Sequence, residues 1–365
     1  MDDYDFALPE ANIAQSPLPE RDAARLMVLE RSSGQILEAG RNHWVRDLPA
    51  WLRRGDLIVV NATRVRSAKL VGQKASGGAA EALLLGPEAS TLDPKVRQFR
   101  ALIKCTGRLR EGLRLRFGND LDLNATVTAL HERGEVSLEF DSRQDPYAFG
   151  EAPLPPYIRR QRGEAAERVG ANDLDRYQTV YAREPGAIAA PTAGLHFTEA
   201  LFRRLREGGV KIAEVILHVG AGTFRPLDAK AITTGLLHAE SFVLPDETVK
   251  AIEETRRSGG RVIAVGTTTA RVLESQASAE GALIPGSGTT DLFIRPGGKP
   301  FRVLDGLLTN FHLPRSSLLL LVAEFLGRGP LMEAYAHAIR EGFRFYSYGD
   351  AMLIIDRAEK TPEAL

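Results

Sequence analysis

One stretch of the chain changes its hydrophobic period, and this change constrains the fold more than any other feature. From about residue 67 to residue 151, apolar residues alternate with polar ones, as in the run 113–117. A period of two is typical of strands with one buried face, and successive short strands with tight turns indicate a small antiparallel barrel. The proline-rich run 153–156 follows this stretch. We therefore predict an inserted β-barrel domain at residues 67–151.

On both sides of this stretch, apolar runs that predict strands alternate with helical patterns. Buried strands are expected at 57–60, 210–219, 261–265 and 351–355. Helices are expected at 199–207, 247–257 and 316–326, and one more after residues 266–269. Such alternation favours a parallel or mixed sheet with covered faces. We predict an α/β fold: a large catalytic α/β domain with a mixed sheet, from residues 1–66 and 152–365, that carries the barrel.

Composition sets the outer limits on function. The chain has 365 residues, which favours two domains over one core. Its 47 basic residues equal its 47 acidic ones, so a nucleic acid would have to bind a local basic patch. The single Cys105 excludes an internal disulfide and a cysteine-rich metal site. The acidic start at residues 1–5 lacks the layout of a signal peptide, and no apolar run is long enough to cross a bilayer. We expect a soluble cytoplasmic protein without a metal.

Positive charge does gather in the predicted barrel. Between Arg97 and Arg116 there are seven basic residues and one acidic residue, Glu111. Small barrels with a basic face commonly bind nucleic acid, although a solvated strand face is an equal alternative. We predict nucleic-acid contacts from six arginines in and just after the barrel: Arg108, Arg110, Arg114, Arg116, Arg159 and Arg160.

Three short segments place histidine, threonine, serine and aspartate beside glycine or proline. They are residues 190–198, 310–317 and 346–353. Glycine and proline fix backbone paths that a generic loop does not need. Polar side chains on rigid turns at the ends of apolar elements are typical of active sites, whereas the alternative is capped turns with satisfied core histidines.

Within these segments, His196 and His312 are the acid–base candidates because histidine titrates near neutral pH. Asp350 is expected to bind substrate or to orient a partner. Ligands bind at strand ends in α/β sheets, so the three residues are predicted to share one crevice. A metal cluster of His196, His218, His238 and His312 is not favoured, since no pair has a helical ligand spacing.

Two glycine motifs follow predicted strands. Gly220 and Gly222 resemble a dinucleotide-binding loop, but Arg225 stands where a third glycine is needed, so this interpretation is weak. The run 266–268 lies between a strand and a helix, where backbone N–H groups and the helix dipole favour a carboxylate or phosphate. A plain helix cap is an equal alternative for that run.

Longer strings resemble a known family over nearly the whole chain. They include residues 61–65, 154–158, 176–181, 191–198, 218–226, 266–268, 290–291, 310–314 and 347–353. On these strings the chain resembles the S-adenosylmethionine:tRNA ribosyltransferase-isomerase family of queuosine biosynthesis. It departs from the family pattern at Ala62, Lys69, Ala221 and Thr289, so no role is given to those four positions.

The resemblance implies both the chemistry and the partners. The family transfers the ribosyl group of S-adenosylmethionine to 7-aminomethyl-7-deazaguanine at the tRNA wobble position. The product is epoxyqueuosine, and adenine and methionine are released. The resemblance implies a larger α/β domain with an inserted barrel, no cofactor beyond S-adenosylmethionine as co-substrate, and a monomer. It extends the expected substrate-binding set to Asn61, Arg64, Tyr177, Thr192, Gly194, His218, Gly220, Gly222, Thr223, Phe224, Gly266, Thr267, Thr268, Asp291, Asn310, Phe311 and Tyr348.

Two other classes of function remain as alternatives. A non-catalytic RNA-binding protein would explain the basic barrel but not the three polar segments. An S-adenosylmethionine-dependent RNA methyltransferase would need a glycine-rich loop after the strand that ends at Val60, and residues 61–64 are Asn-Ala-Thr-Arg instead. Release of free adenine separates ribosyl transfer from both.

Overall fold

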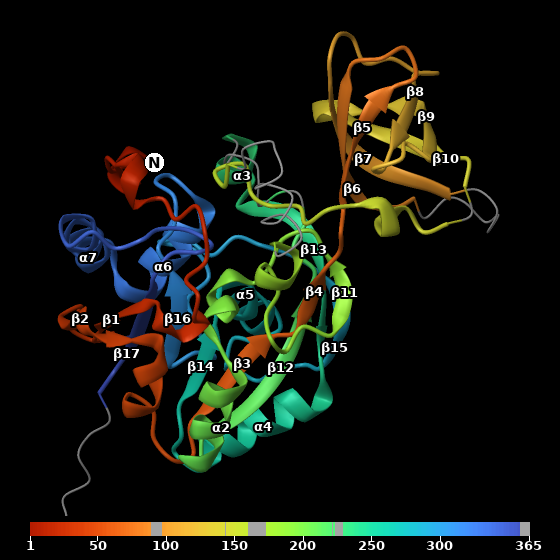
Figure 1. Cartoon of the computed structure of the whole chain (residues 1–365). Coiled ribbons are helices and arrows are strands. Elements are labelled where there is room, and N and C mark those ends of the chain that lie inside the picture. The colour runs from red at the N-terminus through yellow and green to blue at the C-terminus, as the bar shows by residue number, and fades with distance from the viewer. Residues whose placement is uncertain (89–96, 143, 160–172, 221, 223–228, 358–365) are drawn as a thin grey trace, which may run out of the picture.

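The structure is a computed structural model that describes the chain except residues 89–96, 143, 160–172, 221, 223–228 and 358–365. Figure 1 shows a large body of strands and helices and a smaller barrel beside it. The predicted fold class, a large α/β body with a mixed sheet and a small antiparallel barrel, is confirmed.

The large body is built on one nine-stranded sheet in the order β15-β13-β12-β3-β14-β16-β17-β1-β2. In the same order these strands are Gly286–Leu292, Leu236–Leu244, Lys211–Leu217, Leu57–Asn61, Val262–Val265, Gly306–Asn310, Ala351–Ile355, Arg25–Leu29 and Ile36–Trp44. Strands β12, β3, β14 and β16 are mutually parallel, whereas β17 runs antiparallel to β16. The carboxyl ends of four central strands and the start of β17 therefore share one edge.

Helices cover both faces of this sheet, which explains why the central strands are apolar throughout. Leu57 and Val59 of β3 pack into one hydrophobic cluster, and Ile58 and Val60 pack into another on the opposite face. The first cluster includes residues of α4 to α7, and the second includes residues of α2. The α-helices are α2 Glu199–Glu207, α3 Ala229–Thr234, α4 Asp246–Arg257, α5 Thr267–Ser275, α6 Ser317–Leu326 and α7 Arg328–Arg340.

The small body is a closed six-stranded antiparallel barrel in the order β10-β7-β6-β5-β8-β9. Alternate residues of its strands, such as Ala80, Ala82 and Leu84, fill the interior. Its strands are β5 Lys69–Lys74, β6 Ala79–Pro87, β7 Arg97–Cys105, β8 Arg114–Phe117, β9 Leu123–Leu130 and β10 Glu135–Phe140. All six lie inside the predicted insertion 67–151, whose boundaries stay a prediction.

The chain passes between the two bodies along two adjacent segments. The backbones of Lys69 and Glu151 are hydrogen-bonded to each other in both directions, at 3.3 and 2.8 Å. Gly150 lies so close to the Ser67 carbonyl that a Cβ there would overlap with it. A short two-stranded sheet of β4, Thr63–Val65, and β11, Glu184–Ala187, adjoins this crossing.

Short 3₁₀ helices connect the remaining elements. They are η1 Asp2–Tyr4, η2 Glu10–Asn12, η3 Arg21–Ala23, η4 Val45–Ala50, η5 Glu132–Gly134, η6 Pro146–Phe149 and η7 Thr192–His196. The last of these carries one of the three polar segments, and it contacts the end of β16.

Candidate active site

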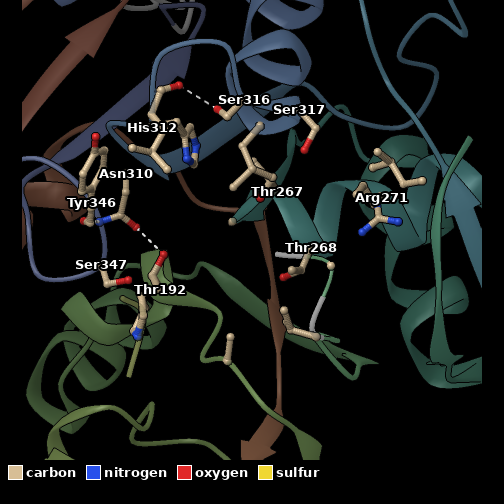
Figure 2. A pocket seen from close by; sticks show the side chains of 18 of the residues that line it. Thr192, Thr267, Thr268, Arg271, Asn310, His312, Ser316, Ser317, Tyr346 and Ser347 are labelled. Atoms are coloured by element: carbon tan, nitrogen blue, oxygen red, sulfur yellow. Dashed lines mark hydrogen bonds between the residues drawn. The ribbon is translucent and has the colours of Figure 1, made fainter. Parts of the chain in front are cut away.

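A pocket of about 1420 Å³ lies at the edge where the central strands end. Its wall includes Thr192 of η7, Asn310 at the end of β16, Thr267 and Thr268 of α5, and Tyr346 before β17 (Figure 2). The topology brings these together because β14 and β16 end, and β17 begins, at this edge. All three polar segments of the sequence contribute to the wall.

Ten of the residues expected from the sequence line this pocket. They are Tyr177, Thr192, Gly222, Gly266, Thr267, Thr268, Asp291, Asn310, Phe311 and His312. The pocket also has a polar far wall, where Arg271 and Glu240 form a buried ion pair. Glu132 of η5 in the barrel is among the lining residues, so the barrel borders the pocket.

His312 lies in the wall and is 8 % exposed. Its Nε2 lies 2.8 Å from the Thr309 hydroxyl, and its backbone N–H donates to the Tyr335 hydroxyl at 2.8 Å. Burial lowers the pKa of His312 to about 3, so the imidazole is neutral at pH 7. A neutral imidazole in the wall of a pocket is able to accept a proton from a ligand.

His196 lies behind the wall and does not line the large pocket. Its Nε2 is 3.1 Å from the Asn310 amide nitrogen, and it borders a small cavity with Tyr348 and Gly349. Burial, with a further contribution from the positive charge of Arg344, lowers the pKa of His196 to about 4. His312 therefore lies in the wall of the large pocket, whereas His196 contacts Asn310 from outside the pocket lining.

Asp350 is also placed away from the pocket lining, and it is 1 % exposed. Its carboxylate accepts hydrogen bonds from the backbone N–H groups of Arg25 and Arg344, at 3.0 and 2.8 Å. The Arg25 side chain adds an ion pair at 3.4 Å. These contacts join the start of β1 to the turn that carries Tyr346.

Six other expected residues lie outside the pocket lining: Asn61, Arg64, Gly194, His218, Gly220 and Tyr348. Most of them support the wall. Asn61 is fully buried. Its side-chain amide forms hydrogen bonds with both the N–H and the carbonyl of Leu217, each at 3.0 Å. Gly194 lies so close to Tyr181 that a Cβ there would overlap with the phenol oxygen.

The remaining members of this group make similar supporting contacts. The His218 ring lies 2.7 Å from the Thr63 hydroxyl, and burial lowers its pKa. The Gly220 N–H donates to Glu240 at 2.8 Å. Tyr348 packs edge-on against Tyr177, with ring centroids 6.0 Å apart. Arg64 is exposed, and Thr223 and Phe224 lie outside the described residues.

Several residues of the wall lie in the segments and strings quoted above but were not among the predicted site residues. Tyr157 and Tyr346 pack with ring centroids 4.7 Å apart, and the Tyr157 hydroxyl lies 2.5 Å from Ser347 Oγ. Tyr346 and Arg315 have positive φ angles of 71° and 55°, a region that non-glycine residues rarely adopt. Such strain concentrates at functional sites, but no sequence signal reveals it for a tyrosine or an arginine.

Among the predicted nucleic-acid contacts, Arg108, Arg110, Arg114 and Arg116 are exposed on the barrel. Arg159 is exposed and lies 2.9 Å from Glu10. Arg160 lies outside the described residues. In the part of the chain that the structure describes, no three histidine, cysteine, aspartate or glutamate side chains lie close enough together to hold a metal ion. No helix of the described ranges is long and apolar enough to span a membrane.

Comparison with known proteins agrees with this architecture. The sequence profile of the family described as "Queuosine biosynthesis protein" matches residues 1–354. The S-adenosylmethionine:tRNA ribosyltransferase-isomerase of Gloeobacter violaceus is 47% identical over 362 residues, covering 98% of this chain and 96% of that protein. The enzyme of the same name from Moorella thermoacetica is 46% identical over 362 residues, covering 97% and 99%.

A solved structure is similar as well. The crystal structure of an S-adenosylmethionine tRNA ribosyltransferase from Thermotoga maritima matches with a TM-score of 0.53 and 34% identity, covering 97% of this chain and all of that one. These matches span the α/β body and the barrel together. The chain belongs to the queuosine biosynthesis protein family.

Proposed function

We propose that this protein is an S-adenosylmethionine:tRNA ribosyltransferase-isomerase. It transfers and isomerises the ribosyl group of S-adenosylmethionine onto 7-aminomethyl-7-deazaguanine at the tRNA wobble position, and releases adenine and methionine. The observation that carries the proposal is the convergence of the three polar segments on one large pocket, in a chain of this family. A pocket of about 1420 Å³ has room for S-adenosylmethionine and a nucleobase together.

The start of α5 supports binding of the methionine carboxylate. Gly266, Thr267 and Thr268 line the pocket at the first turn of a nine-residue helix. The Gly266 N–H is already bonded to the Leu308 carbonyl at 2.8 Å, but the N–H groups of Thr267 and Thr268 have no partner within the helix, and these groups and the helix dipole favour a negative charge there. The guanidinium of Arg271 is engaged by Glu240 and by the carbonyl of Leu292, so the helix start is the better carboxylate site.

The aromatic pair Tyr157 and Tyr346 supports binding of a base. Both rings line the pocket, and their neighbour Ser347 adds a hydroxyl. A flat base gains about 1–3 kcal/mol from stacking on an aromatic ring. We assign this side of the pocket to adenine, which places the ribose between the aromatic pair and α5.

His312 is the proton-transfer group in this proposal. The sulfonium of S-adenosylmethionine acidifies the C5′ protons of the ribose, and a neutral base in the wall is able to accept one. His312 lines the pocket, whereas His196 and Asp350 do not. The low pKa of His312 keeps the ring unprotonated at neutral pH but also makes it a weak base, so the proposal requires that bound substrate raises this pKa toward neutrality.

The barrel is assigned to the tRNA. Its exposed Arg108, Arg110, Arg114 and Arg116 suit phosphate contacts, and Glu132 borders the pocket from the same body. A substrate held by the barrel would present its wobble base to the pocket. We infer that the protein acts as a monomer in the cytoplasm, where its tRNA substrate is found.

Product analysis tests the activity. The protein is mixed with S-adenosylmethionine and an anticodon stem-loop that carries 7-aminomethyl-7-deazaguanine. Adenine and methionine are expected in equal amounts, and neither is expected with the matched stem-loop that carries guanine. Formation of S-adenosylhomocysteine would show methyl transfer instead. The absence of any product with both RNAs would favour the alternative of a non-catalytic RNA-binding protein.

A further inference from the structure

A chain of buried hydrogen bonds leads from the interior to the pocket wall through Asn310. The Asn310 side chain is 2 % exposed. Its amide nitrogen lies 3.1 Å from the Tyr346 carbonyl oxygen and 3.1 Å from His196 Nε2. Its amide oxygen lies 3.0 Å from the Thr192 hydroxyl, an interaction marked in Figure 2.

The chemistry of these groups fixes the direction of every hydrogen bond in the chain. A carbonyl only accepts, so the Asn310 NH₂ group must face Tyr346, and its second proton points at His196. His196 Nε2 must then accept, and its proton lies on Nδ1, consistent with a hydrogen bond to the Arg21 backbone. The Asn310 oxygen faces Thr192 and accepts, so the threonine hydroxyl donates its only proton to it.

The Thr192 hydroxyl oxygen therefore has only lone pairs free to face the pocket, so it can accept a hydrogen bond from a ligand but cannot donate one. The contrast with Thr268 on the facing wall is instructive, because Thr268 Oγ accepts a proton from the Asn61 amide at 3.1 Å. Asn61 is oriented by the N–H and the carbonyl of Leu217, so its direction is fixed too. Thr268 keeps its own proton to donate, and the two pocket hydroxyls have opposite polarity.

We propose that His196 and Asn310 are positioning residues that hold the Thr192 hydroxyl as a fixed hydrogen-bond acceptor. The group that it recognises is an N–H or O–H donor of the substrate, such as an amine or a ribose hydroxyl. The inference deepens the proposed function and rests on it for the substrate. It gives His196 a role in catalysis that involves no transfer of a proton by its ring.

Substitutions at His196 separate positioning from proton transfer. Glutamine can place its amide oxygen where His196 Nε2 lies and accept the hydrogen bond from the Asn310 NH₂ group. It cannot take up or release a proton at neutral pH. Phenylalanine keeps the ring volume and accepts nothing. We expect His196→Gln to retain kcat/KM within about three-fold, with an unchanged pH profile. His196→Phe should lose at least about ten-fold, since one charge-neutral hydrogen bond of about 1.4 kcal/mol corresponds to that factor.

Substitutions at Thr192 test the end of the hydrogen-bond chain that lies at the pocket. Thr192→Ser keeps the hydroxyl and should keep activity, whereas Thr192→Val should lose about as much as His196→Phe. The double variant of His196→Phe and Thr192→Val should be little worse than either alone, because both break one chain. The Thr192 pair keeps the proposal testable where His196→Phe does not fold.

Three results would overturn the proposal. If folded His196→Gln lost activity as deeply as His196→Phe, His196 would transfer protons. If His196→Phe kept full activity, or if Thr192→Val matched Thr192→Ser, the chain would not matter for the reaction. A parent protein that released no adenine would instead refute the proposed function.

A measurement without substrate tests the hydrogen-bond direction by itself. Long-range ¹H–¹⁵N correlation spectra of the histidine-labelled protein at pH 7 should show His196 as the neutral tautomer with its proton on Nδ1. The signal is assigned by its loss in His196→Gln. A proton on Nε2 at pH 7, whether from the other tautomer or from a charged ring, would refute the fixed direction even if adenine release were normal.

Discussion

Burial determines the charge state of both histidines near the pocket. Burial lowers the pKa of His312, and no acidic group of the described residues offsets this effect, so its ring is neutral at pH 7. His196 is neutral because of burial and the positive charge of Arg344. The two rings differ in what they face: His312 meets the pocket, whereas His196 meets Asn310. The same residue type therefore lies in two different environments near one pocket.

The first prediction concerns His312. His312→Ala and His312→Gln should lower single-turnover adenine release by about 10²–10⁴-fold, which is the usual contribution of a general acid or base. The affinity for the tRNA stem-loop should change little, as measured by fluorescence anisotropy. Should both folded variants turn over within a few-fold of the parent, the proton acceptor must be sought elsewhere, for example at the substrate's own amine.

The second prediction concerns stability against pH. Both histidines have folded-state pKa values below the ordinary value of 6.5, so the unfolded chain takes up protons first as the pH falls. Stability is complete above about pH 6.5 and decreases as the pH falls toward 4 and then 3. Each histidine should remove on the order of 2 kcal/mol between pH 7 and pH 5.

Urea unfolding at the two pH values measures this loss. His196→Gln is the matched control, because it lacks the titrating group and should lose less stability between pH 7 and pH 5 than the parent. An equal loss in the two proteins would show that His196 is not held neutral by the fold.

At the scale of elements, local capping sets where the helices near the pocket begin. Thr198 accepts a hydrogen bond from the Leu201 N–H at 3.1 Å and thereby caps α2, directly after η7. Ser316 caps α6 in the same way through the Leu319 N–H at 3.2 Å. Both caps immediately follow turns with a histidine, so they fix the direction in which each turn leaves the sheet edge.

The third prediction concerns the cap of α2. Thr198→Ala should lower the free energy of unfolding by about 1–2 kcal/mol, because it leaves a helix N–H unsatisfied. The upper part of that range is expected because the Thr198 hydroxyl also donates a hydrogen bond to the Asp22 carboxylate at 3.1 Å. Thr198→Ser is the control and should keep nearly full stability. Both variants should turn over normally at 25 °C, and a loss of activity in folded Thr198→Ala would show that the cap also sets the site geometry.

At the scale of the whole molecule, the chain forms two bodies, the large α/β body and the barrel. The sheet edge of the large body holds the pocket, and the barrel, which lies beside the large body in Figure 1, carries a set of exposed arginines. Two adjacent chain segments, paired at Lys69 and Glu151, join the bodies. Under the proposed function, the tRNA would contact the barrel while its wobble base enters the pocket of the large body.

The fourth prediction concerns RNA affinity. Replacing Arg108, Arg110, Arg114 and Arg116 by alanine should weaken stem-loop binding and flatten its dependence on salt. Each lost phosphate contact removes about 0.7–0.9 from the slope of log K against log salt concentration. The measurement is a titration at several salt concentrations. The control replaces four exposed basic residues of the large body: Arg203, Arg206, Lys250 and Arg257. Equal slopes in the two variants would show that the barrel arginines do not contact RNA phosphates and only form a solvated face.

The sequence alone determined the elements whose patterns are local. Helix 199–207 and strand 351–355 were predicted with their observed bounds, and α6 begins one residue after its predicted start because Ser316 is its cap. The barrel was visible because a period of two differs from the pattern around it. Strands β1, β2, β13, β15 and β16 were not predicted. β13 and β15 mix exposed and buried residues without a clear period, whereas β1 and β16 are short buried runs that periodicity alone does not distinguish from part of a helix.

Only the tertiary structure decided what each polar residue faces. His196, His312 and Asp350 lie in similar glycine- and proline-bounded turns, and nothing local distinguishes them. Strand order places His312 in the pocket wall, His196 behind Asn310, and Asp350 against the backbone of Arg25 and Arg344. Helices and strands follow from short-range periodicity, whereas the direction of a side chain at a sheet edge depends on which distant segment packs beside it.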